Sequence, residues 1–551
     1  MRVLGIHGWF HDSNVALVED GNVLTAMQHE RVTRKKHDGS FPIETANEII
    51  KDAGVGVVDI NNIALPISPF WDFVKESKVY TKHAPWLTKR VLFEGNKFKY
   101  IGLRAIRFLR LKRHLKKIGL ENVPISFIPH HICHTSSAYM MSGFDKALIF
   151  TFDAEGDWLS GSVSIGDKSE ITKVKDFTVA QSLGIFYSSI TRICGMRAMD
   201  EEWKIMGLAP YGKFDPSKYE NIIKLNFDKE NIISPDIRNH TIFFKKLLQK
   251  PQTFEEKAEV ASWGQWLLEE IATKTIQHFM DEYKIYNVCI GGGVGLNTKM
   301  NQRIKDNTEA KDIFIIPEPG DAGLALGAAL EVCRLNGMKN NKKLDSVYWG
   351  TFYSNQMIND ELKNHQQLNF EENSDVSRFA AEEISKGRII AWYNGNMEWG
   401  PRALGNRSIL ADPSDPKMKD KVNNLVKYRE GWRPFASSIL NESLKDFVVN
   451  PVEAPFMIMT FDVIEERKKD ILSVVHVDGT TRPQTVRRKQ NPKYYDLINE
   501  FKKISGIPMA LNTFFNLRGE PIVRSPADAI STFMRSNMDY LILGDYVVTK
   551  K

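Results

Sequence analysis

Two stretches of the chain share one alternation of apolar and polar positions. In residues 3–27 the strand-like segments VLGIHG, NVALVED and NVLTAM are separated by the polar segment WFHDS and by Gly21. In residues 147–174 the corresponding segments are ALIFTF, LSGSVSIG and SEITKV, and DAEGDW follows the first of them. The pattern predicts two copies of a three-stranded unit, with Asp12 and Asp153 at the first turn of each copy.

A third element, residues 287–300 (NVCIGGGVGLNTKM), predicts a strand, a glycine turn and the start of a helix. The three glycines Gly291, Gly292 and Gly293 let backbone N–H groups approach a nucleotide closely. Their spacing fits neither the Rossmann fingerprint nor the P-loop. Residues 317–330 (PEPGDAGLALGAAL) add a loop with Asp321 before an Ala/Gly-rich helix. Together with the duplicated hairpins this favours an actin-like or sugar-kinase-like nucleotide fold, although any α/β protein can contain glycine-turned hairpins.

The polar, basic stretch 336–346 predicts a linker between two α/β domains, residues 1–345 and 346–551. A chain of 551 residues with 42% hydrophobic and 26% charged residues can hold two or three domains with sizeable cores. Its net charge of +6 does not by itself indicate nucleic acid, although it suits anionic substrates such as ATP. The four cysteines form no Cys-x-x-Cys pair, which argues against zinc ribbons and disulfide frameworks. We see no signal peptide or membrane-spanning stretch and expect a cytoplasmic protein.

A basic segment runs from Lys78 to Lys117, with Glu94 as its single acidic residue. Its part LRAIRFLRLKRHLKKI is typical of a basic amphipathic helix. Such a helix is either a solvated element packed on the first domain or a surface for an anionic or membrane-linked acceptor.

The segment PHHICHTSS places two histidines, His130 and His134, four residues apart, so they share a face of a helix. A histidine pair at this spacing alone is more often structural than ligating. With Asp153 at a strand end and Asp321 in the glycine-rich loop, however, it makes a mixed nitrogen and oxygen set. Two imidazoles and two carboxylates suit Fe(II), zinc or manganese and leave positions open for substrate oxygens.

Basic residues recur among turns in the second predicted domain. They lie in NGNMEWGPRALGNRSIL, KYREGWRPFASS, HVDGTTRPQTV and LNTFFNLRGEPIV rather than on a helix face. Guanidinium groups at turns are suited to bind phosphate or carboxylate groups. We therefore predict a pocket for several anions, built from Arg402, Arg407, Lys427, Arg429, Arg433, His476, Arg482, Asn512, Asn516 and Arg518.

Many motifs of this chain, in one order over its whole length, resemble those of the NodU/CmcH carbamoyltransferase family. They include FHDSNVALVEDG, HERVTRKKH, HHICHTSSAY, FDAEGD, WKIMGLAPYG, GGGVGLNTKMN, GDAGLALGAA, GPRALGNRSIL, WRPFASS, HVDGTTRPQTV and RGEPIV. The resemblance implies an ASKHA domain, which is actin-like, duplicated and akin to the tRNA threonylcarbamoyl transferases, followed by a YrdC-like α/β domain. It also implies two steps. The YrdC-like domain makes carbamoyl adenylate from ATP, held with Mg²⁺, and carbamoyl phosphate, and the ASKHA domain then transfers the carbamoyl group to a hydroxyl of a small-molecule or sugar acceptor.

The resemblance also implies roles for individual residues. His130, His134, Asp153 and Asp321 match Fe²⁺ ligands, and His11, Asp12 and Lys204 fall in the motifs of the acceptor side and the adjoining nucleotide site. The implied nucleotide-binding residues are Gly291, Gly292, Gly293, Asn297, Lys427, Arg429 and Asn512. The implied carbamoyl phosphate and anion-binding residues are Arg402, Arg407, Ser408, Arg433, His476, Arg482 and Arg518.

Two positions depart from the family's usual pattern. Phe514 stands where relatives commonly have serine, and Trp203 precedes Lys204 where Gly or Tyr is frequent. The first change puts one contact of the YrdC-like pocket in doubt, and the second could reshape the acceptor site. Two alternatives stay open: threonylcarbamoyl transfer to tRNA, and a non-catalytic ATP-binding sensor or scaffold. We expect no nucleic-acid partner, and the sequence identifies neither the acceptor nor the oligomeric state.

Overall fold

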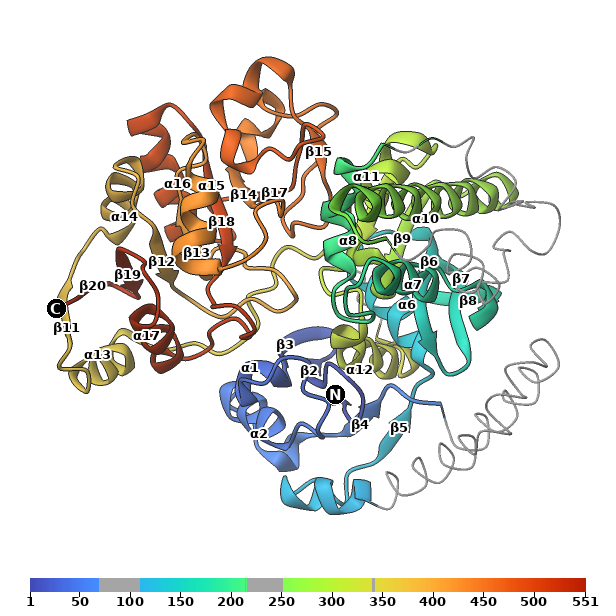
Figure 1. The fold of residues 1–551 in the computed structure, drawn as a ribbon. Helices are drawn as coiled ribbons and strands as arrows, with labels where there is room; N and C mark the ends of the chain where they lie inside the picture. The colour runs from blue at the N-terminus through green and yellow to red at the C-terminus, as the bar shows by residue number, and fades with distance from the viewer. Residues whose placement is uncertain (69–109, 214, 216–250, 339–341) are drawn as a thin grey trace. The chain divides into compact units, whose positions relative to one another are not determined.

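The computed structural model describes residues 1–68, 110–213, 215, 251–338 and 342–551, and these form two compact units. We call residues 1–29 and 37–344 the N-terminal unit, and residues 30–36 and 345–551 the C-terminal unit. Both are mixed α/β structures (Figure 1). The basic segment is outside the described residues up to residue 109, and residues 110–117 are helical.

The first sheet of the N-terminal unit has the strand order β3-β2-β1-β4-β5. Three antiparallel strands come first and two parallel strands join them: β1 (Arg2–His7), β2 (Asn14–Glu19), β3 (Asn22–Gln28), β4 (Asn62–Leu65) and β5 (Ile125–Phe127). The first predicted hairpin unit is confirmed, and Asp12 lies in the loop between β1 and β2.

The second sheet repeats this topology, with the order β10-β9-β6-β7-β8. Its strands are β6 (Lys146–Gly156), β7 (Leu159–Asp167), β8 (Glu170–Thr178), β9 (Asn287–Gly291) and β10 (Asp312–Ile315). The duplication predicted from the alternation is therefore confirmed. One detail differs: β6 continues past the predicted turn, but its pairing with β7 is irregular between Phe152 and Gly156, so Asp153 lies in that irregularity.

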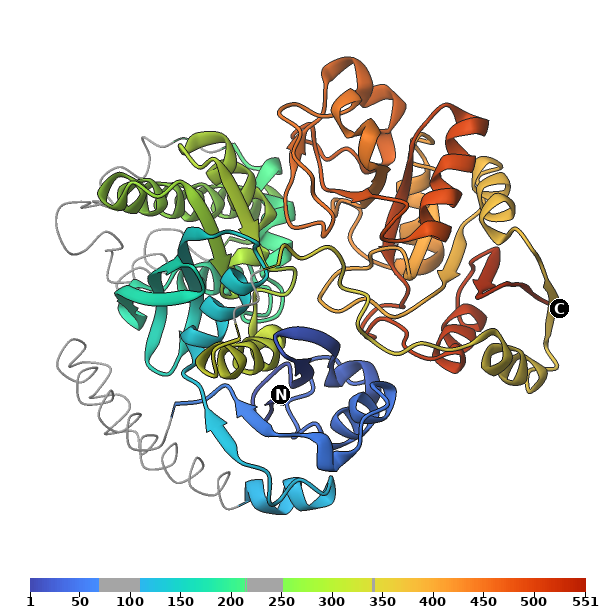
Figure 2. The ribbon, with the colours of Figure 1, turned by 180° about the vertical axis from the view of Figure 1, so that it is seen from behind.

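Two helices connect the sheets. α12 (Leu324–Leu335) packs on β1 and β2, α6 (His130–Met140) packs on β6 and β9, and the two helices pack on each other. In Figure 2, α12 lies against the blue strands of the first sheet. A Cβ atom on Gly327 would lie 2.0 Å from the carbonyl oxygen of Cys133 in α6, so only glycine permits this close approach.

We expect Gly327→Ala to lower the free energy of unfolding of the N-terminal unit by about 2 kcal/mol. An overpacked core position costs roughly 1–3 kcal/mol, and the higher helix propensity of alanine offsets up to about 1 kcal/mol. Urea unfolding followed by circular dichroism measures the change. Gly431→Ala is the control, because a Cβ atom there meets nothing within 4 Å. Equal midpoints for the two variants would contradict this packing argument.

The other helices of the N-terminal unit lie around the second sheet. α10 (Phe254–Tyr283) packs on α7 (Leu183–Ile193), α8 (Glu202–Leu208) and α11 (Thr298–Asn307). Thr253 begins α10 with a capping box, in which its hydroxyl accepts from the N–H of Glu256.

The C-terminal unit is built on an eight-stranded mixed sheet with the order β11-β20-β19-β12-β13-β18-β14-β17. The strands are β11 (Leu368–Glu372), β12 (Ile390–Tyr393), β13 (Arg407–Ala411), β14 (Ala436–Leu440), β17 (Pro483–Val486), β18 (Met509–Phe514), β19 (Tyr540–Leu543) and β20 (Tyr546–Lys550). α14 (Val376–Ser385) and α16 (Pro492–Ser505) pack together and bury their apolar faces against this sheet, around Trp392.

Residues 30–36, which include most of α1 (His29–Thr33), belong to the C-terminal unit. Arg31 donates to the carbonyl oxygen of Gly400 at 3.1 Å, and Arg34 donates to the carbonyl oxygens of Pro521 and Ile522 at 2.9 and 2.5 Å. This division differs from the predicted boundaries at Asp345 and in residues 30–36, which two arginines hold against the C-terminal unit.

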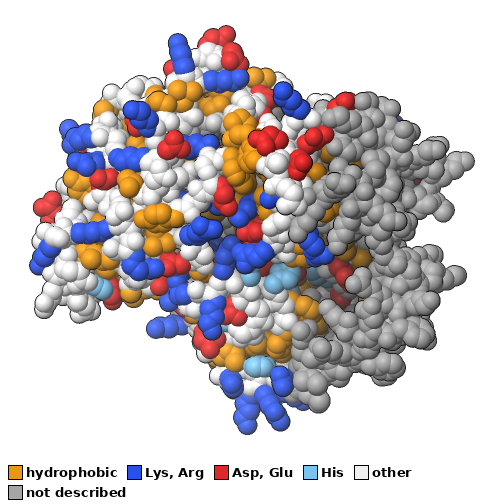
Figure 3. Space-filling model, viewed as in Figure 1, with side chains coloured by type: hydrophobic (Ala, Val, Ile, Leu, Met, Phe, Trp, Pro, Cys, Tyr) orange, Lys and Arg blue, Asp and Glu red, His pale blue; other side chains and the backbone are white. Residues whose placement is uncertain are grey.

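No helix of the described part of the chain is long and apolar enough to cross a membrane. On the face of the C-terminal unit drawn in Figure 3, Lys and Arg side chains are interspersed with Asp and Glu.

Candidate functional site

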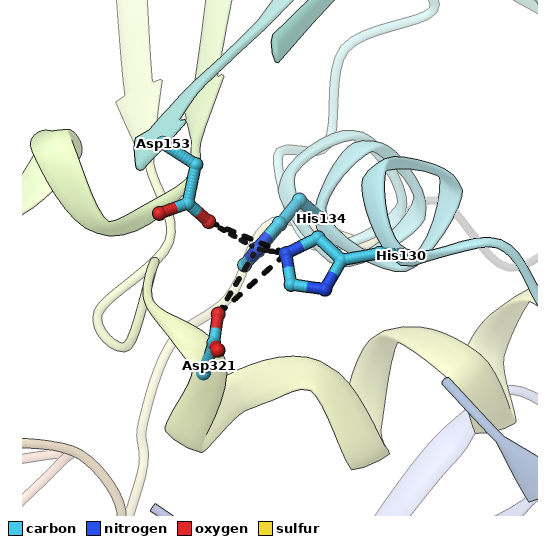
Figure 4. Close-up of side chains that lie close together, drawn as sticks. All are labelled: His130, His134, Asp153 and Asp321. Carbon is cyan, nitrogen blue, oxygen red and sulfur yellow. Dashed lines mark hydrogen bonds and ion pairs between the residues drawn. The ribbon is translucent and has the colours of Figure 1, made fainter. Parts of the chain in front are cut away.

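Four side chains from three elements converge in the N-terminal unit. His130 and His134 project from α6, Asp153 from β6, and Asp321 from the turn that precedes α12 (Figure 4). One donor atom from each lies within 4.8 Å of all the others. The convergence predicted from the sequence is therefore present in the fold.

The separations within this cluster fit a single metal ion. The Nε2 atoms of His130 and His134 are 3.1 Å apart, and each lies 3.3 or 3.0 Å from Oδ2 of Asp153. The same nitrogens lie 3.6 and 3.7 Å from Oδ1 of Asp321. With metal–ligand bonds of about 2.0–2.1 Å, ligand atoms adjacent in a tetrahedral or octahedral site lie about 2.9–3.4 Å apart. The separations among His130, His134 and Asp153 fall in this range, and those to Asp321 are slightly longer. The donor set of two imidazoles and two carboxylates suits iron, zinc or manganese.

Buried polar contacts outside the cluster hold its elements in place. Asp157 accepts from the backbone N–H of His130 at 3.0 Å, where its charge also favours the amino end of α6. Asn14, which is fully buried, donates to the carbonyl oxygens of Asp12 and Asp321 and accepts from the N–H of Ala325. Asn14 therefore links the β1–β2 loop to the turn that carries Asp321. Sequence reasoning missed both residues.

Two glycines let backbone approach the cluster. A Cβ atom on Gly156 would lie 2.1 Å from the ring of His130. Gly292 has a φ of +84°, and a Cβ atom there would meet the carbonyl oxygen of Phe152 at 2.3 Å. The glycine turn predicted from the sequence thus lies against the strand that carries Asp153.

The electrostatics of the cluster favour a bound cation. Burial opposes the charge on His134, but hydrogen bonds to Asp153 and Asp321 outweigh it and raise the pKa of His134 to about 9. Burial alone would raise the pKa of Asp153, yet His130 and His134 hold it well below its usual range. Two buried carboxylates are thus kept ionised, which is the state that metal ligation requires.

His11 and Asp12 adjoin this cluster. Nδ1 of His11 lies 2.8 Å from Oδ2 of Asp12, and its Nε2 lies 3.6 Å from Oδ2 of Asp321. The hydrogen bond to Asp12 raises the pKa of His11 to about 9 against the opposing effect of burial. The structure therefore brings both predicted acceptor-side residues next to the four side chains of this cluster.

His37 is a further member of the site that sequence reasoning did not single out. Its Nδ1 lies 2.7 Å from Oδ1 of Asp12, and its Nε2 lies 2.9 Å from Oδ1 of Asp200. Its signal was the motif HERVTRKKH, which carries the family resemblance. His37 and Asp12 are twenty-five positions apart in the sequence, so local spacing did not predict their contact.

Two predicted residues of the nucleotide side have structural partners in the N-terminal unit. Asn297 caps α11 by accepting from the N–H of Met300, and its amide exchanges two hydrogen bonds with Gln265. Nζ of Lys204 lies 2.8 Å from Glu201 and 5.5 Å from the ring centre of Trp203. The bulky residue before Lys204 thus packs against the side chain that it precedes.

The predicted arginines gather in the C-terminal unit. Burial lowers the pKa of Arg482 well below its usual range, and the nearby charges of Arg402, Arg429 and Arg433 lower it further. The pKa of Lys427 is depressed by burial and by Arg429 and Arg433. We call these five residues the cationic cluster. A bound anion would offset this mutual repulsion, so the cationic cluster is a candidate anion site.

Arg407 and Ser408 have a different setting. Arg407 is fully buried, donates to the carbonyl oxygens of Asn394, Gly395, Asn406 and Thr351, and stacks 3.6 Å from the ring centre of Tyr393. Ser408 is fully buried in β13 and accepts from the N–H of Gly405. These contacts fit a role in shaping the loop that carries Arg402 better than direct contact with a ligand.

The remaining predicted residues lie around the cationic cluster or support it. Lys427 donates to Asn516 and to the backbone carbonyl oxygen of Phe514, so the change from serine at position 514 leaves this contact intact.

Asn512 is buried and donates to the carbonyl oxygen of Ala403 and the hydroxyl of Ser438. Arg518 is exposed and donates to the carbonyl oxygen of Tyr428, and His476 is buried with Nδ1 3.5 Å from Asp478.

Comparisons with known proteins agree with both units. The family model described as Carbamoyltransferase N-terminus matches residues 2–330, and that described as Carbamoyltransferase C-terminus matches residues 381–550. Among solved structures, full-length HypF in its phosphate- and nucleotide-bound form has a TM-score of 0.38 and 12% identity, over 61% of this chain and 55% of that chain. A TM-score and an identity this low do not show a shared function.

Curated relatives cover nearly the whole chain. Nodulation protein NolNO of Sinorhizobium fredii is 36% identical over 98% of this chain and 79% of its own length. The uncharacterized protein sll1178 of Synechocystis is 33% identical over 100% of this chain and 97% of its own length. Nodulation protein U of Sinorhizobium fredii is 25% identical over 96% of both. With two family models along the chain and relatives of this coverage, the chain belongs to the NodU/CmcH-type carbamoyltransferase family and is an enzyme that transfers carbamoyl groups.

Proposed function

We propose that this enzyme is an ATP-dependent O-carbamoyltransferase with an ASKHA-like N-terminal unit and a YrdC-like C-terminal unit. In the C-terminal unit, water first cleaves carbamoyl phosphate into carbamate and phosphate. The carbamate oxygen then attacks the α-phosphorus of ATP, which forms carbamoyl adenylate and releases pyrophosphate. The N-terminal unit then transfers the carbamoyl group to a hydroxyl of a small-molecule or sugar acceptor, and AMP leaves. The observation that carries the proposal is the presence of two chemically distinct sites, a histidine–carboxylate cluster in one unit and a cationic cluster in the other.

The cationic cluster is suited to the first step. Both substrates of that step are phosphorylated anions, and their charges would offset the mutual repulsion of Arg402, Arg429, Arg433 and Arg482. Arg429 is already oriented, because it donates to Asn423 and stacks 4.1 Å from the ring centre of Phe435. Preorganised donors of this kind stabilise the charge that develops when a phosphoryl group is transferred.

The histidine–carboxylate cluster is suited to the second step. An alcohol is a weak nucleophile at neutral pH, so its proton needs a receiving group close by. His11, once deprotonated at Nε2, can receive this proton beside Asp321, while Asp12 fixes its other nitrogen. Because the pKa of His11 is raised to about 9, this form increases as the pH rises towards that value. Water must be excluded from an adenylate, and the buried ligands of α6 and β6 provide a largely enclosed setting.

A metal ion would be held by His130, His134, Asp153 and Asp321, and we propose Fe²⁺ as the resident ion. Such an ion supplies Lewis-acid stabilisation to phosphate or carbamoyl oxygens. The fit rests on the distances between the four donor atoms and on the ionised state of both carboxylates.

Separating the two half-reactions tests the proposal. The purified full chain is incubated with ATP, Mg²⁺ and carbamoyl phosphate but no acceptor, and pyrophosphate and carbamoyl adenylate are followed by mass spectrometry. We expect Arg433→Ala to slow pyrophosphate release by about 10–100-fold, the effect of losing hydrogen bonds to a charged group. His130→Ala should leave this half-reaction unchanged.

Arg388→Ala is the matched control, because Arg388 is half-exposed and pairs with Asp539 in the same unit. It should release pyrophosphate at the wild-type rate. Wild-type protein that forms no adenylate with any divalent metal would refute the first step. Equal loss in Arg433→Ala and His130→Ala would refute the division of labour between the two units.

A further inference from the structure

His37 lies between two carboxylates on the side of Asp12 away from His11. Nδ1 of His37 is 2.7 Å from Oδ1 of Asp12, and Nε2 is 2.9 Å from Oδ1 of Asp200. The other oxygen of Asp12, Oδ2, is 2.8 Å from Nδ1 of His11. The four side chains therefore form one hydrogen-bonded row within the N-terminal unit.

The chemistry of this row sets the protonation of His37. An ionised carboxylate can only accept hydrogen bonds, so each ring nitrogen that bonds to one must carry a proton. Asp12 is ionised, because the hydrogen bonds from His11 and His37 hold its pKa below the usual range although burial would raise it. With carboxylates at both nitrogens, His37 is an imidazolium that donates in both directions.

The outer end of the row is itself fixed. Oδ2 of Asp200 lies 2.7 Å from a guanidinium nitrogen of Arg197, and its backbone carbonyl oxygen accepts from Nε1 of Trp203 at 3.1 Å. Asp200 is 14% exposed and Arg197 is 74% exposed, so the carboxylate at this end of the row is largely shielded from solvent while its partner guanidinium is not. Because these contacts hold Asp200 in place, its carboxylate is a fixed hydrogen-bond acceptor for Nε2 of His37.

The backbone at the inner end is strained. Asp12 has a φ of +62° and His37 a φ of +56°, a left-handed conformation that residues other than glycine seldom adopt. Asn14 holds the carbonyl oxygen of Asp12 at 2.8 Å, which leaves the carboxylate to be oriented by its own hydrogen bonds. His37 supplies one of these bonds and His11 the other.

We propose that His37 and Asp200 are a positioning pair for the acceptor side of the site. His37 holds Oδ1 of Asp12 so that Oδ2 stays directed at Nδ1 of His11, and Asp200 keeps His37 in its doubly protonated form. The importance of His11 rests on the proposed function, whereas the row of hydrogen bonds does not.

Nuclear magnetic resonance of the full chain, with ¹⁵N-labelled histidine, tests this inference through the ring N–H signals. Wild-type protein is expected to show two slowly exchanging ring N–H signals from His37 and one from Nδ1 of His11. His37→Gln should abolish both His37 signals and also shift or broaden the His11 signal. His365→Gln is the matched control, because Nε2 of His365 also bonds a carboxylate, that of Glu361 at 3.0 Å in the C-terminal unit.

Two changes at Asp200 separate charge from shape. Asp200→Asn keeps the shape but removes the charge, and its amide can donate to an unprotonated Nε2, so the Nε2–H signal of His37 should be lost while its Nδ1–H signal and the His11 signal remain. Asp200→Ala removes the acceptor and should cause loss of the Nε2–H signal. A His11 signal that is unchanged in His37→Gln, or a His37 ring with a single N–H in the wild type, would overturn the inference.

The same samples are assayed for pyrophosphate release without acceptor. If the signals behave as expected while no variant or wild type forms carbamoyl adenylate, the proposed function fails and the positioning pair stands. If adenylate forms but the His11 signal is the same in His37→Gln as in the wild type, only the inference about the positioning pair is refuted.

Discussion

Asp153→Ala is expected to weaken metal binding by at least about 100-fold. Loss of a residue that merely orients a ligand costs roughly 10–100-fold in metal affinity, and Asp153 supplies a ligand atom and a negative charge. Its Oδ2 lies within 3.3 Å of both imidazole nitrogens, so no other described side chain of the cluster replaces that contact. Metal content after dialysis and calorimetric titration with Fe²⁺, Zn²⁺ and Mn²⁺ measure the change.

Glu155→Ala is the control for this prediction. Glu155 lies on the same strand, two residues from Asp153, and is exposed; its carboxyl interacts electrostatically with His130 but is not one of the four converging groups. The control should bind metal as the wild type does. Retention of full metal affinity by Asp153→Ala would remove the basis for a metal centre at this place.

Arg482→Met is expected to stabilise the ligand-free protein and to impair it as an enzyme. Burial and three neighbouring guanidiniums disfavour the charge of Arg482, and replacement of a buried charge by an apolar side chain of similar length often stabilises by about 1–4 kcal/mol. The same change removes a donor for phosphate, so pyrophosphate release should fall by about 100-fold. Thermal unfolding without ligand and the acceptor-free assay measure the two effects.

Arg488→Met provides the comparison, because Arg488 is 69% exposed and pairs with Asp496. It should change neither quantity appreciably. A lower unfolding temperature for Arg482→Met would mean that another group already neutralises the charge of Arg482 in the ligand-free protein. Arg482 would then not be the central residue of the anion site. A variant that is more stable but slower is the result expected when a functional site holds like charges together at the expense of the stability of the protein.

The sequence predicted the histidine–carboxylate cluster because each part of it had a local signal. The spacing of His130 and His134 is a helical one, Asp153 follows an alternating strand, and Asp321 lies in a glycine-rich loop before a helix. The duplicated sheets were predictable for the same reason, because alternation with period two is visible in each copy. The irregular pairing around Asp153 was not, since a bulge has no signature in alternation alone.

The supporting residues could not be found in this way. Asn14 and His37 act through contacts with residues that are distant in the chain or on another element, and neither has a spacing that predicts its partner. Arg407 shows the opposite difficulty. Its motif is typical of an anion-binding arginine, but its guanidinium is used by backbone carbonyl oxygens, and sequence does not tell which acceptor a guanidinium faces.

The placement of residues 30–36 makes the border between the units discontinuous along the chain. The polypeptide passes from one unit to the other three times, after His29, after Lys36 and after Leu344. A fragment beginning at Asp345 would lack Arg31 and Arg34, and the carbonyl oxygens of Gly400, Pro521 and Ile522 would lose these donors. We therefore expect a protein that begins at Asp345 to be less stable alone than in the presence of a peptide that carries residues 30–36.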